Sequence, residues 1–299
     1  MVEISYLQIV LLAVIQGLAE LLPISSTAHV IVAEKLMGLK DPSSPELTFL
    51  LVMLHTGTMF AVLFYFWPRW KPLLLPSVSS ADQTGLTGSP FHFVKMILLA
   101  TVCTGVLGLG LKILIEKVLL VGMLGHEKGE VEELFKNLPL IATGLFVVGL
   151  LIVASGSRET KSERSVLTAQ SSVWIGLMQG LCLPFRGFSR SGATISTALF
   201  CGISRRLAED FSFALAVVLT PPVIFLELRR LLQARDWQNS AALIDLLLPG
   251  VLGMAFSFLA GLLALKLLSA ALEKGRWKYF GFYCLAASFI VLGAARFGL

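Results

Sequence analysis

Charged side chains are scarce in this sequence. Asp, Glu, Lys and Arg make up 14% of its 299 residues, whereas soluble domains usually carry about 25%. Hydrophobic residues make up 56%, and the mean hydropathy is +0.83. This composition excludes an ordinary soluble domain and predicts an integral membrane protein.

Cysteine is also rare, and its four copies are dispersed without a CxxC pair. They are Cys103, Cys182, Cys201 and Cys284. The pattern predicts small hydrophobic side chains within helices rather than a disulfide framework.

Lys and Arg exceed Asp and Glu and give a net charge of +5. Neither an aromatic-interleaved basic stripe nor zinc-finger spacing accompanies this excess, so nucleic acid is not expected as a partner. Basic loops at lipid headgroups explain the charge better, and membrane lipids are the expected surroundings. Lys and Arg divide almost evenly between the two sides of the predicted spans, which leaves the membrane orientation open.

Long apolar stretches recur along the chain, most of them close to the roughly 20 residues that a spanning helix needs. They are residues 49–67, 96–111, 138–154, 217–226, 246–265 and 279–295. Residues 4–36 and 173–203 are apolar too, but Pro, Gly, Ser and a charge interrupt each of them midway. Because unwound backbone at membrane depth must be buried or line a wet cavity, both predict re-entrant helix-loop-helix pairs. We expect an all-α polytopic membrane protein with about six full transmembrane helices and two re-entrant pairs.

The two interrupted segments carry similar polar sequences, QGLAELLPISST from residue 16 and QGLCLPFRGFSRSG from residue 179. Ser25 and Ser189 lie 189 − 25 = 164 positions apart, and Glu46 is echoed by Asp210 at the same offset, 210 − 46 = 164. This register predicts a single membrane domain, residues 1–299, built from repeats of about 1–155 and 156–299. With an odd number of crossings between them, the re-entrant pairs enter from opposite faces and their tips meet near the midplane, as in an inverted-topology repeat.

The second repeat places a guanidinium among hydroxyl groups, at Ser189, Arg190, Ser191 and Thr194. A half-helix that starts at about Gly192 directs its N–H groups and its positive end toward the same spot as Arg190, and such a spot binds phosphate. Snorkelling or a structural ion pair is the alternative for the arginine. Helix capping or helix packing is the alternative for the hydroxyls.

The first repeat supplies a carboxylate, because Gln16 and Glu20 lie four residues apart and share a helix face. The polar residues that follow Pro23 are Ser25, Ser26, Thr27 and His29. A carboxylate in hydrocarbon needs a partner or a cation, so Glu20 is a candidate functional residue. His29 is a candidate general acid or base, the alternative being an ordinary buried histidine. His55 matches Leu219 in the other repeat and is not expected to be catalytic.

Residues 16–29 and 187–194 resemble the two signature regions of the BacA-type undecaprenyl-diphosphate phosphatases, and the resemblance covers essentially the whole chain. It implies a multi-pass enzyme of the bacterial inner membrane that removes one phosphate from undecaprenyl diphosphate. This reaction recycles the lipid carrier of cell-wall synthesis, and the family is often linked to bacitracin resistance. The resemblance also implies a divalent cation, Mg²⁺ or Ca²⁺, and a site facing the periplasm, and it leaves a homodimer open.

Some positions depart from the family pattern. Gln16 stands where the family has Glu or Gln, which leaves Glu20 as the carboxylate of that pair, and Ala28 stands where Gly is usual. Residues 183–187 differ more, because the family commonly has Pro directly before Gly and one residue fewer. Arg186 in this segment is either a second phosphate ligand or a contact to lipid headgroups.

Phosphoryl transfer mainly demands positioning and neutralisation of charge. Arg190 is expected to hold the diphosphate, and Glu20 a cation that bridges its oxygens, with Gln16 as a further candidate metal ligand. The other expected phosphate contacts are Ser25, Thr27, Ser189, Ser191, Gly192 and Thr194. The nucleophile stays open between Ser26, activated by His29 or Glu20, and a water activated by His29.

Secondary transporters also bind anions with inverted repeats and broken helices, so a lipid-phosphate flippase or organic-anion carrier is the competing interpretation. Ser26, Glu20 and His29 favour an enzyme, because binding alone does not require them. The acid phosphatases that cleave lipid phosphates are excluded, since they need a histidine six residues after the arginine, where this chain has Ser196.

Overall fold

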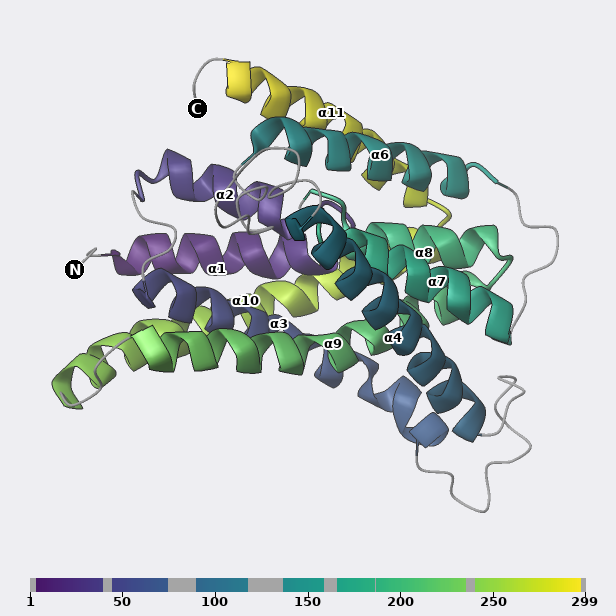
Figure 1. Cartoon of the computed structure of the whole chain (residues 1–299), viewed down its shortest axis with the longest axis horizontal. Helices are drawn as coiled ribbons and strands as arrows, with labels where there is room; N and C mark the ends of the chain where they lie inside the picture. Colours follow the sequence, from purple (N-terminus) through teal and green to yellow (C-terminus); the bar gives the residue numbers. More distant parts are fainter. Residues whose placement is uncertain are drawn as a thin grey trace. The chain divides into compact units, whose positions relative to one another are not determined.

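The computed structural model describes residues 4–39, 45–74, 90–117, 137–158, 166–185, 187–234 and 240–296. Within these ranges the chain forms helices and no strand (Figure 1). The helices of the first half are α1 (Tyr6–Leu21), α2 (Ser26–Leu36), α3 (Pro45–Leu74), α4 (Pro90–Ile113) and α6 (Leu138–Gly156). Those of the second half are α7 (Ala169–Cys182), α8 (Arg190–Phe200), α9 (Arg205–Ala234), α10 (Ser240–Glu273) and α11 (Trp277–Arg296). The predicted all-α class is confirmed.

The order of helix lengths repeats along the chain. Helices α1, α2 and α3 contain 16, 11 and 30 residues, and α7, α8 and α9 contain 14, 11 and 30. Helices α2 and α8 begin at Ser26 and Arg190, and 190 − 26 = 164 is the offset of the sequence motifs. The duplication in the sequence therefore has a counterpart in the order of the helices.

Six helices among the described residues are long and apolar enough to cross a membrane, as the sequence predicts. Their apolar parts are Leu47–Pro72, Phe91–Lys117, Leu138–Gly156, Arg205–Leu226, Leu247–Glu273 and Trp277–Arg296. The fourth span, Arg205–Leu226, is longer than the predicted 217–226. Helix α9 includes the acidic residues Glu209 and Asp210, which a search for uncharged apolar stretches leaves out. The two interrupted segments form shorter helices, with breaks at residues 22–25 and 183–189.

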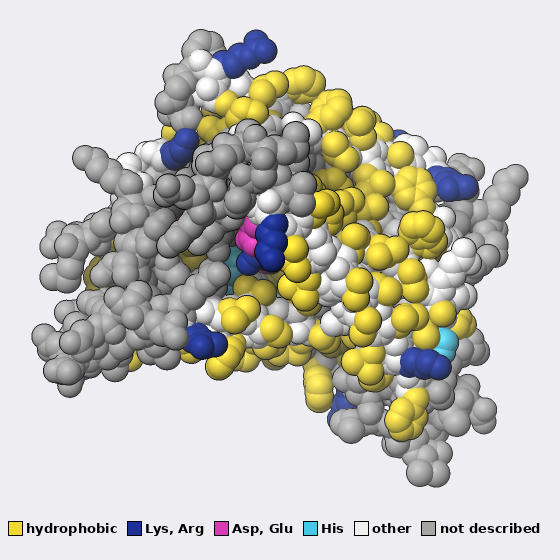
Figure 2. Space-filling view, viewed as in Figure 1, with side chains coloured by type: hydrophobic (Ala, Val, Ile, Leu, Met, Phe, Trp, Pro, Cys, Tyr) yellow, Lys and Arg dark blue, Asp and Glu magenta, His cyan; other side chains and the backbone are white. Residues whose placement is uncertain are grey.

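The surface of these helices is apolar where lipid is expected. Helix α4 exposes Leu98, Val102, Val106 and Leu109, which lie three or four residues apart and so share one face. Hydrophobic side chains make up much of the described surface in the viewed face, with few Lys and Arg between them (Figure 2). The chain is thus a multi-pass membrane protein.

The chain divides into two compact units that do not coincide with its two halves. The first unit takes Met1–Leu22, Ser26–Phe66 and Ala216–Leu268, and the second takes Pro23–Ser25, Trp67–Leu215 and Ser269–Leu299. Each unit thus combines segments from both sequence repeats. The assignment of one domain built from residues 1–155 and 156–299 stays a prediction.

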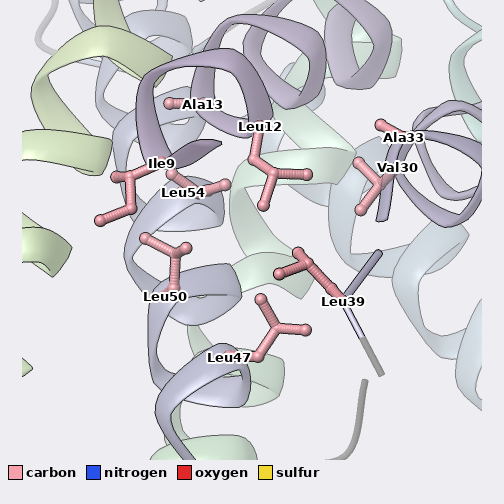
Figure 3. Packing of buried hydrophobic residues seen from close by; sticks show 9 residues of the cluster. All are labelled: Ile9, Leu12, Ala13, Val30, Ala33, Leu39, Leu47, Leu50 and Leu54. Atoms are coloured by element: carbon pink, nitrogen blue, oxygen red, sulfur yellow. The ribbon is translucent and has the colours of Figure 1, made fainter. Parts of the chain in front are cut away.

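In the first unit, α1, α2 and the start of α3 share an apolar core (Figure 3). It consists of Ile9, Leu12, Ala13, Val30, Ala33, Leu39, Leu47, Leu50 and Leu54. Helix α10 approaches α1 closely, since a Cβ on Gly17 would lie 2.6 Å from the carbonyl oxygen of Ser257. Small residues at such contacts let helices pack backbone to backbone.

In the second unit, α11 packs along α6, and α4 packs on α7 (Figure 1). Gly149 and Gly281 face each other across the first pair, and Gly180 lies against Thr104 in the second. The indole nitrogen of Trp277 donates to Ser155 at 3.1 Å and to Ser196 at 3.2 Å, which joins α11 to α6 and α8. This packing surrounds α8, the helix that begins at Arg190.

A buried ion cluster also lies in the second unit. Arg69 donates to Glu209 at 3.0 Å and to Asp210 at 3.2 Å, and Ser269 donates to Glu209. Glu209 and Asp210 are 2% and 3% exposed. A buried carboxylate is costly unless it is paired and hydrogen-bonded. These contacts therefore explain how α9 carries two adjacent acids within an apolar helix.

We expect Arg69→Met to destabilise the protein by about 3 kcal/mol or more, because it leaves two buried carboxylates without their cation. Thermal unfolding in detergent measures the change as a lower melting temperature. Neutralising the acids as well, in Arg69→Met/Glu209→Gln/Asp210→Asn, restores most of the loss. An unchanged melting temperature in the single variant would contradict the role given to Arg69.

Candidate active site

The first group of polar side chains, here called the carboxylate cluster, consists of Gln16, Glu20, Ser26 and His55. The hydroxyl of Ser26 donates to Oε2 of Glu20 at 2.6 Å. The amide nitrogen of Gln16 lies 3.3 Å from the same oxygen and 2.6 Å from Nδ1 of His55. All four residues belong to the first unit. The predicted neighbourhood of Gln16, Glu20 and Ser26 is therefore confirmed.

The turn between α1 and α2 brings Ser26 to Glu20. Pro23 lacks an N–H group and disfavours helix at the residue before it, so α1 ends at Leu21. Ser25 then takes a φ of +67°, the left-handed region, and is the one residue other than glycine to do so among those described. Such a conformation costs on the order of 1 kcal/mol. It reverses the chain so that α2 begins at Ser26.

Two further candidates lie on α2. Thr27 and His29 occupy its first turn, within the first unit, and both are partly exposed. The segment after the break thus carries two hydroxyls and an imidazole close together in sequence on one short helix. This placement agrees with the sequence prediction, and the roles of Thr27 and His29 stay predictions.

The second group, here called the arginine turn, comprises residues 187–194 and belongs to the second unit. The hydroxyl of Ser189 accepts from the N–H of Gly192 at 3.3 Å, so Ser189 is the N-cap and α8 begins at Arg190. The sequence predicted that this helix starts at about Gly192. The start is two residues earlier, because Ser189 caps the helix and Arg190 is already helical. The N–H of Ala193 bonds to the carbonyl of Ser189 at 2.9 Å.

The hydroxyls of this turn have structural partners. The hydroxyl oxygens of Ser189 and Ser191 lie 3.4 Å apart. Thr194 donates to the carbonyl of Arg190 at 2.8 Å, and its oxygen lies 2.6 Å from that of Ser212 on α9. The capping alternative thus holds for Ser189 and the packing alternative for Thr194. Their contacts with phosphate stay predictions.

Two glycines let the arginine turn approach its neighbours. Gly187 has a φ of +93° and lies against the backbone of Ile141, so neither its conformation nor its surroundings suit a larger residue. A Cβ on Gly192 would lie 3.3 Å from Cβ of Pro23. Pro23, Ser25 and Gly192 all belong to the second unit. Within it, Pro23 at the break between α1 and α2 lies against the first turn of α8.

The structure therefore groups the predicted site residues in two sets. Gln16, Glu20, Ser26, Thr27 and His29 lie in the first unit. Ser25, Ser189, Arg190, Ser191, Gly192 and Thr194 lie in the second. Arg186 lies outside the described residues.

No group of three or more His, Cys, Asp or Glu side chains is placed to hold a metal ion in the described part of the chain.

The contact of His55 with Gln16 was not predicted from the sequence. Leu219, the counterpart of His55, gave no reason to expect a functional residue, and no local motif marks His55. The one signal was a histidine within an otherwise apolar span, and intramembrane ionisable residues are functional candidates by default. The contact with Gln16 arises only when α3 packs beside α1.

A family model described as "Bacitracin resistance protein BacA" matches residues 9–290. The chain belongs to the BacA family. It is 56% identical to undecaprenyl-diphosphatase 2 of Acinetobacter baylyi over 292 residues, which cover 97% of this chain and 98% of the relative. It is 34% identical to undecaprenyl-diphosphatase of Desulfosudis oleivorans, over 96% of this chain and 97% of the relative. The resemblance inferred from the two motifs is thus confirmed at the level of the BacA family.

We expect Ser189→Ala to lower the stability of the protein by about 1 kcal/mol, because α8 loses its N-cap acceptor. Ser189→Asn keeps an acceptor at the cap and retains the melting temperature in detergent. Equal melting temperatures for Ser189→Ala and the wild type would show that the cap contributes nothing.

Proposed function

We propose that this protein hydrolyses undecaprenyl diphosphate to undecaprenyl phosphate and inorganic phosphate, and so recycles the lipid carrier of cell-wall synthesis. Relatives that cover almost the whole chain carry the name undecaprenyl-diphosphatase. The observation that carries the chemistry is the 2.6 Å hydrogen bond from Ser26 to Glu20, which pairs a nucleophilic hydroxyl with a base. Substrate binding alone does not require that pair.

The two broken segments are proposed to be re-entrant pairs of an inverted-topology repeat, in the bacterial inner membrane, with the site facing the periplasm. The repeated helix lengths support the duplication, and the contact of Pro23 with Gly192 supports a meeting of the two breaks. Such meeting points are where inverted repeats bind their ligands. The isoprenyl tail then stays in lipid while its diphosphate reacts.

The proposed reaction gives separate roles to Arg190 and to the carboxylate cluster. Arg190 binds phosphate oxygens, and the positive end of α8 adds to the field that attracts them. The N–H groups of Gly192 and Ala193 bond to Ser189, so the side chain of Arg190 and the helix dipole are the proposed phosphate-binding elements of this turn. The charge that develops on the transferred phosphoryl oxygens is neutralised at this end of the site.

Ser26 is the nucleophile that the hydrogen bond to Glu20 favours. Its oxygen attacks the terminal phosphorus, its proton passes to Glu20, and undecaprenyl phosphate leaves as the anhydride bond breaks. Water then hydrolyses the phosphoserine, with His29 as the base that accepts the proton of that water. Direct attack by a water activated at His29 is the alternative, and it predicts no phosphoserine.

A divalent cation, Mg²⁺ or Ca²⁺, is part of the proposal. Mg²⁺ commonly binds one or two carboxylates together with substrate phosphates and waters, so the single carboxylate of Glu20 fits this donor set. Gln16 directs its amide nitrogen toward Glu20, and a nitrogen of this kind is not a metal ligand. When bound, the cation supplies neutralisation of phosphate charge.

A carrier of lipid phosphates or organic anions is the competing function. Release of inorganic phosphate by purified protein in detergent separates the two, because a carrier acts only across compartments. Phosphate release from undecaprenyl diphosphate supports the enzyme, whereas its absence in a folded protein favours the carrier.

We expect Glu20→Ala and Arg190→Ala each to lower phosphate release from undecaprenyl diphosphate by more than about 100-fold, because each removes a charge from the reacting centre. Glu273→Ala and Arg276→Ala are the matched controls, since both side chains are exposed and lie outside the site. Substantial activity in either site variant would remove that residue from the mechanism.

We expect a chelator to abolish phosphate release and added Mg²⁺ or Ca²⁺ to restore it. Comparison of EDTA, which binds both ions, with EGTA, which prefers Ca²⁺, identifies the metal. Full activity of metal-free protein in excess EDTA would exclude the cation from the reaction.

A further inference from the structure

The amide of Gln16 lies between two hydrogen-bond acceptors. Its nitrogen is 3.3 Å from Oε2 of Glu20 and 2.6 Å from Nδ1 of His55, and the residue is 1% exposed. An amide NH₂ group has two hydrogens and donates to both neighbours at once. The reversed amide would set its oxygen against the carboxylate oxygen, and two acceptors repel. Glu20 therefore fixes which way the amide of Gln16 faces.

This orientation fixes the histidine tautomer as well. Because Gln16 donates toward Nδ1, that nitrogen must be an acceptor, and the proton of the neutral ring is on Nε2. The tautomer follows from the hydrogen-bond network. The result is a continuous chain of contacts from His55 through Gln16 and Glu20 to Ser26.

His55 is well placed to hold Gln16, because α3 is anchored on both sides of it. Leu54 is fully buried in the core with α1 (Figure 3). Its carbonyl accepts from Ser257 of α10 at 2.8 Å, and Gly57 lies directly against Met254. A hydrogen-bond partner on a rigid helix positions a long side chain more accurately than one on a loop.

The second repeat has no histidine at the position of His55, and its glutamine has a different hydrogen-bond partner. Leu219 stands at the position of His55, and 219 − 55 = 164 is the repeat offset. The glutamine of that repeat, Gln179, instead donates to Thr104 of α4 at 3.2 Å. The repeat with the histidine is the one that carries the carboxylate.

We propose that His55 is a positioning residue of the phosphatase reaction, which accepts from Gln16 so that the amide holds the carboxylate of Glu20 against Ser26. This inference rests on the proposed function, since it concerns the same site. In this proposal His55 acts through Gln16 and has no direct role in the chemical step. Supporting groups of this kind set the orientation of the residues that do the chemistry.

The test compares His55→Leu, which removes the acceptor, with His55→Asn, whose Oδ1 can accept near the position of Nδ1. We expect His55→Leu to lower kcat at least about 10-fold with little change in KM, the scale on which loss of a supporting partner acts. His55→Asn regains most of the kcat. His92→Leu, at a histidine in the second unit, is the control and keeps the wild-type kcat.

A double-mutant cycle with Gln16→Leu tests whether the effect passes through Gln16. In the Gln16→Leu background, His55→Leu is expected to cause no further loss. If His55→Leu does not fold, judged by size-exclusion chromatography and melting temperature, His55→Met takes its place in the same cycle. Wild-type kcat in the folded His55 variant, an Asn variant as impaired as the Leu variant, or additive losses in the cycle would each overturn the inference.

The same assay keeps this inference separate from the proposed function. A folded wild-type protein that releases no phosphate refutes the proposed function, whatever residue 55 contributes. An active wild type with a fully active His55→Leu variant refutes the role of His55 alone.

Discussion

Within hydrocarbon every backbone polar group must find a partner inside the protein, and this constraint decides where the helices of this chain can break. The break at residues 22–25 is covered, because Cys284 of α11 donates to the carbonyl of Pro23. The break at 183–189 is covered where Gly187 lies against Ile141 of α6. Helices α6 and α11, which pack together through facing glycines, thus shield both interruptions.

Polar side chains in the protein obey the same constraint, and they meet it in two ways. The ion cluster of Arg69 with Glu209 and Asp210 joins α3 to α9 and is fully engaged in structure. In the carboxylate cluster, Glu20 accepts from Ser26 and Gln16, which are neutral donors. Arg69 brings a positive charge to its two acids, whereas the hydrogen bonds from Ser26 and Gln16 position Glu20 without adding one.

Much of the architecture was predictable from composition and repetition. The six spans and the two interrupted segments follow from local properties, because hydropathy and proline act on neighbouring residues, and the 164-residue offset is read directly from the repeated motifs. The start of α8 was misplaced because the N-cap geometry of Ser189 depends on backbone angles. The extent of α9 was underestimated because its two acids find their cation on α3, which lies 140 positions away from Glu209 in the sequence.

The sequence by itself determined that this is a helical membrane protein of the BacA family pattern, with a carboxylate in one motif and an arginine in the other. The tertiary structure alone decided which hydrogen bonds these groups make. Ser26 reaches Glu20 because Ser25 turns the chain back, and His55 reaches Gln16 because α3 packs beside α1. Hydropathy is a property of each residue, whereas a hydrogen bond needs two groups within about 3 Å of each other, and only folding sets that distance.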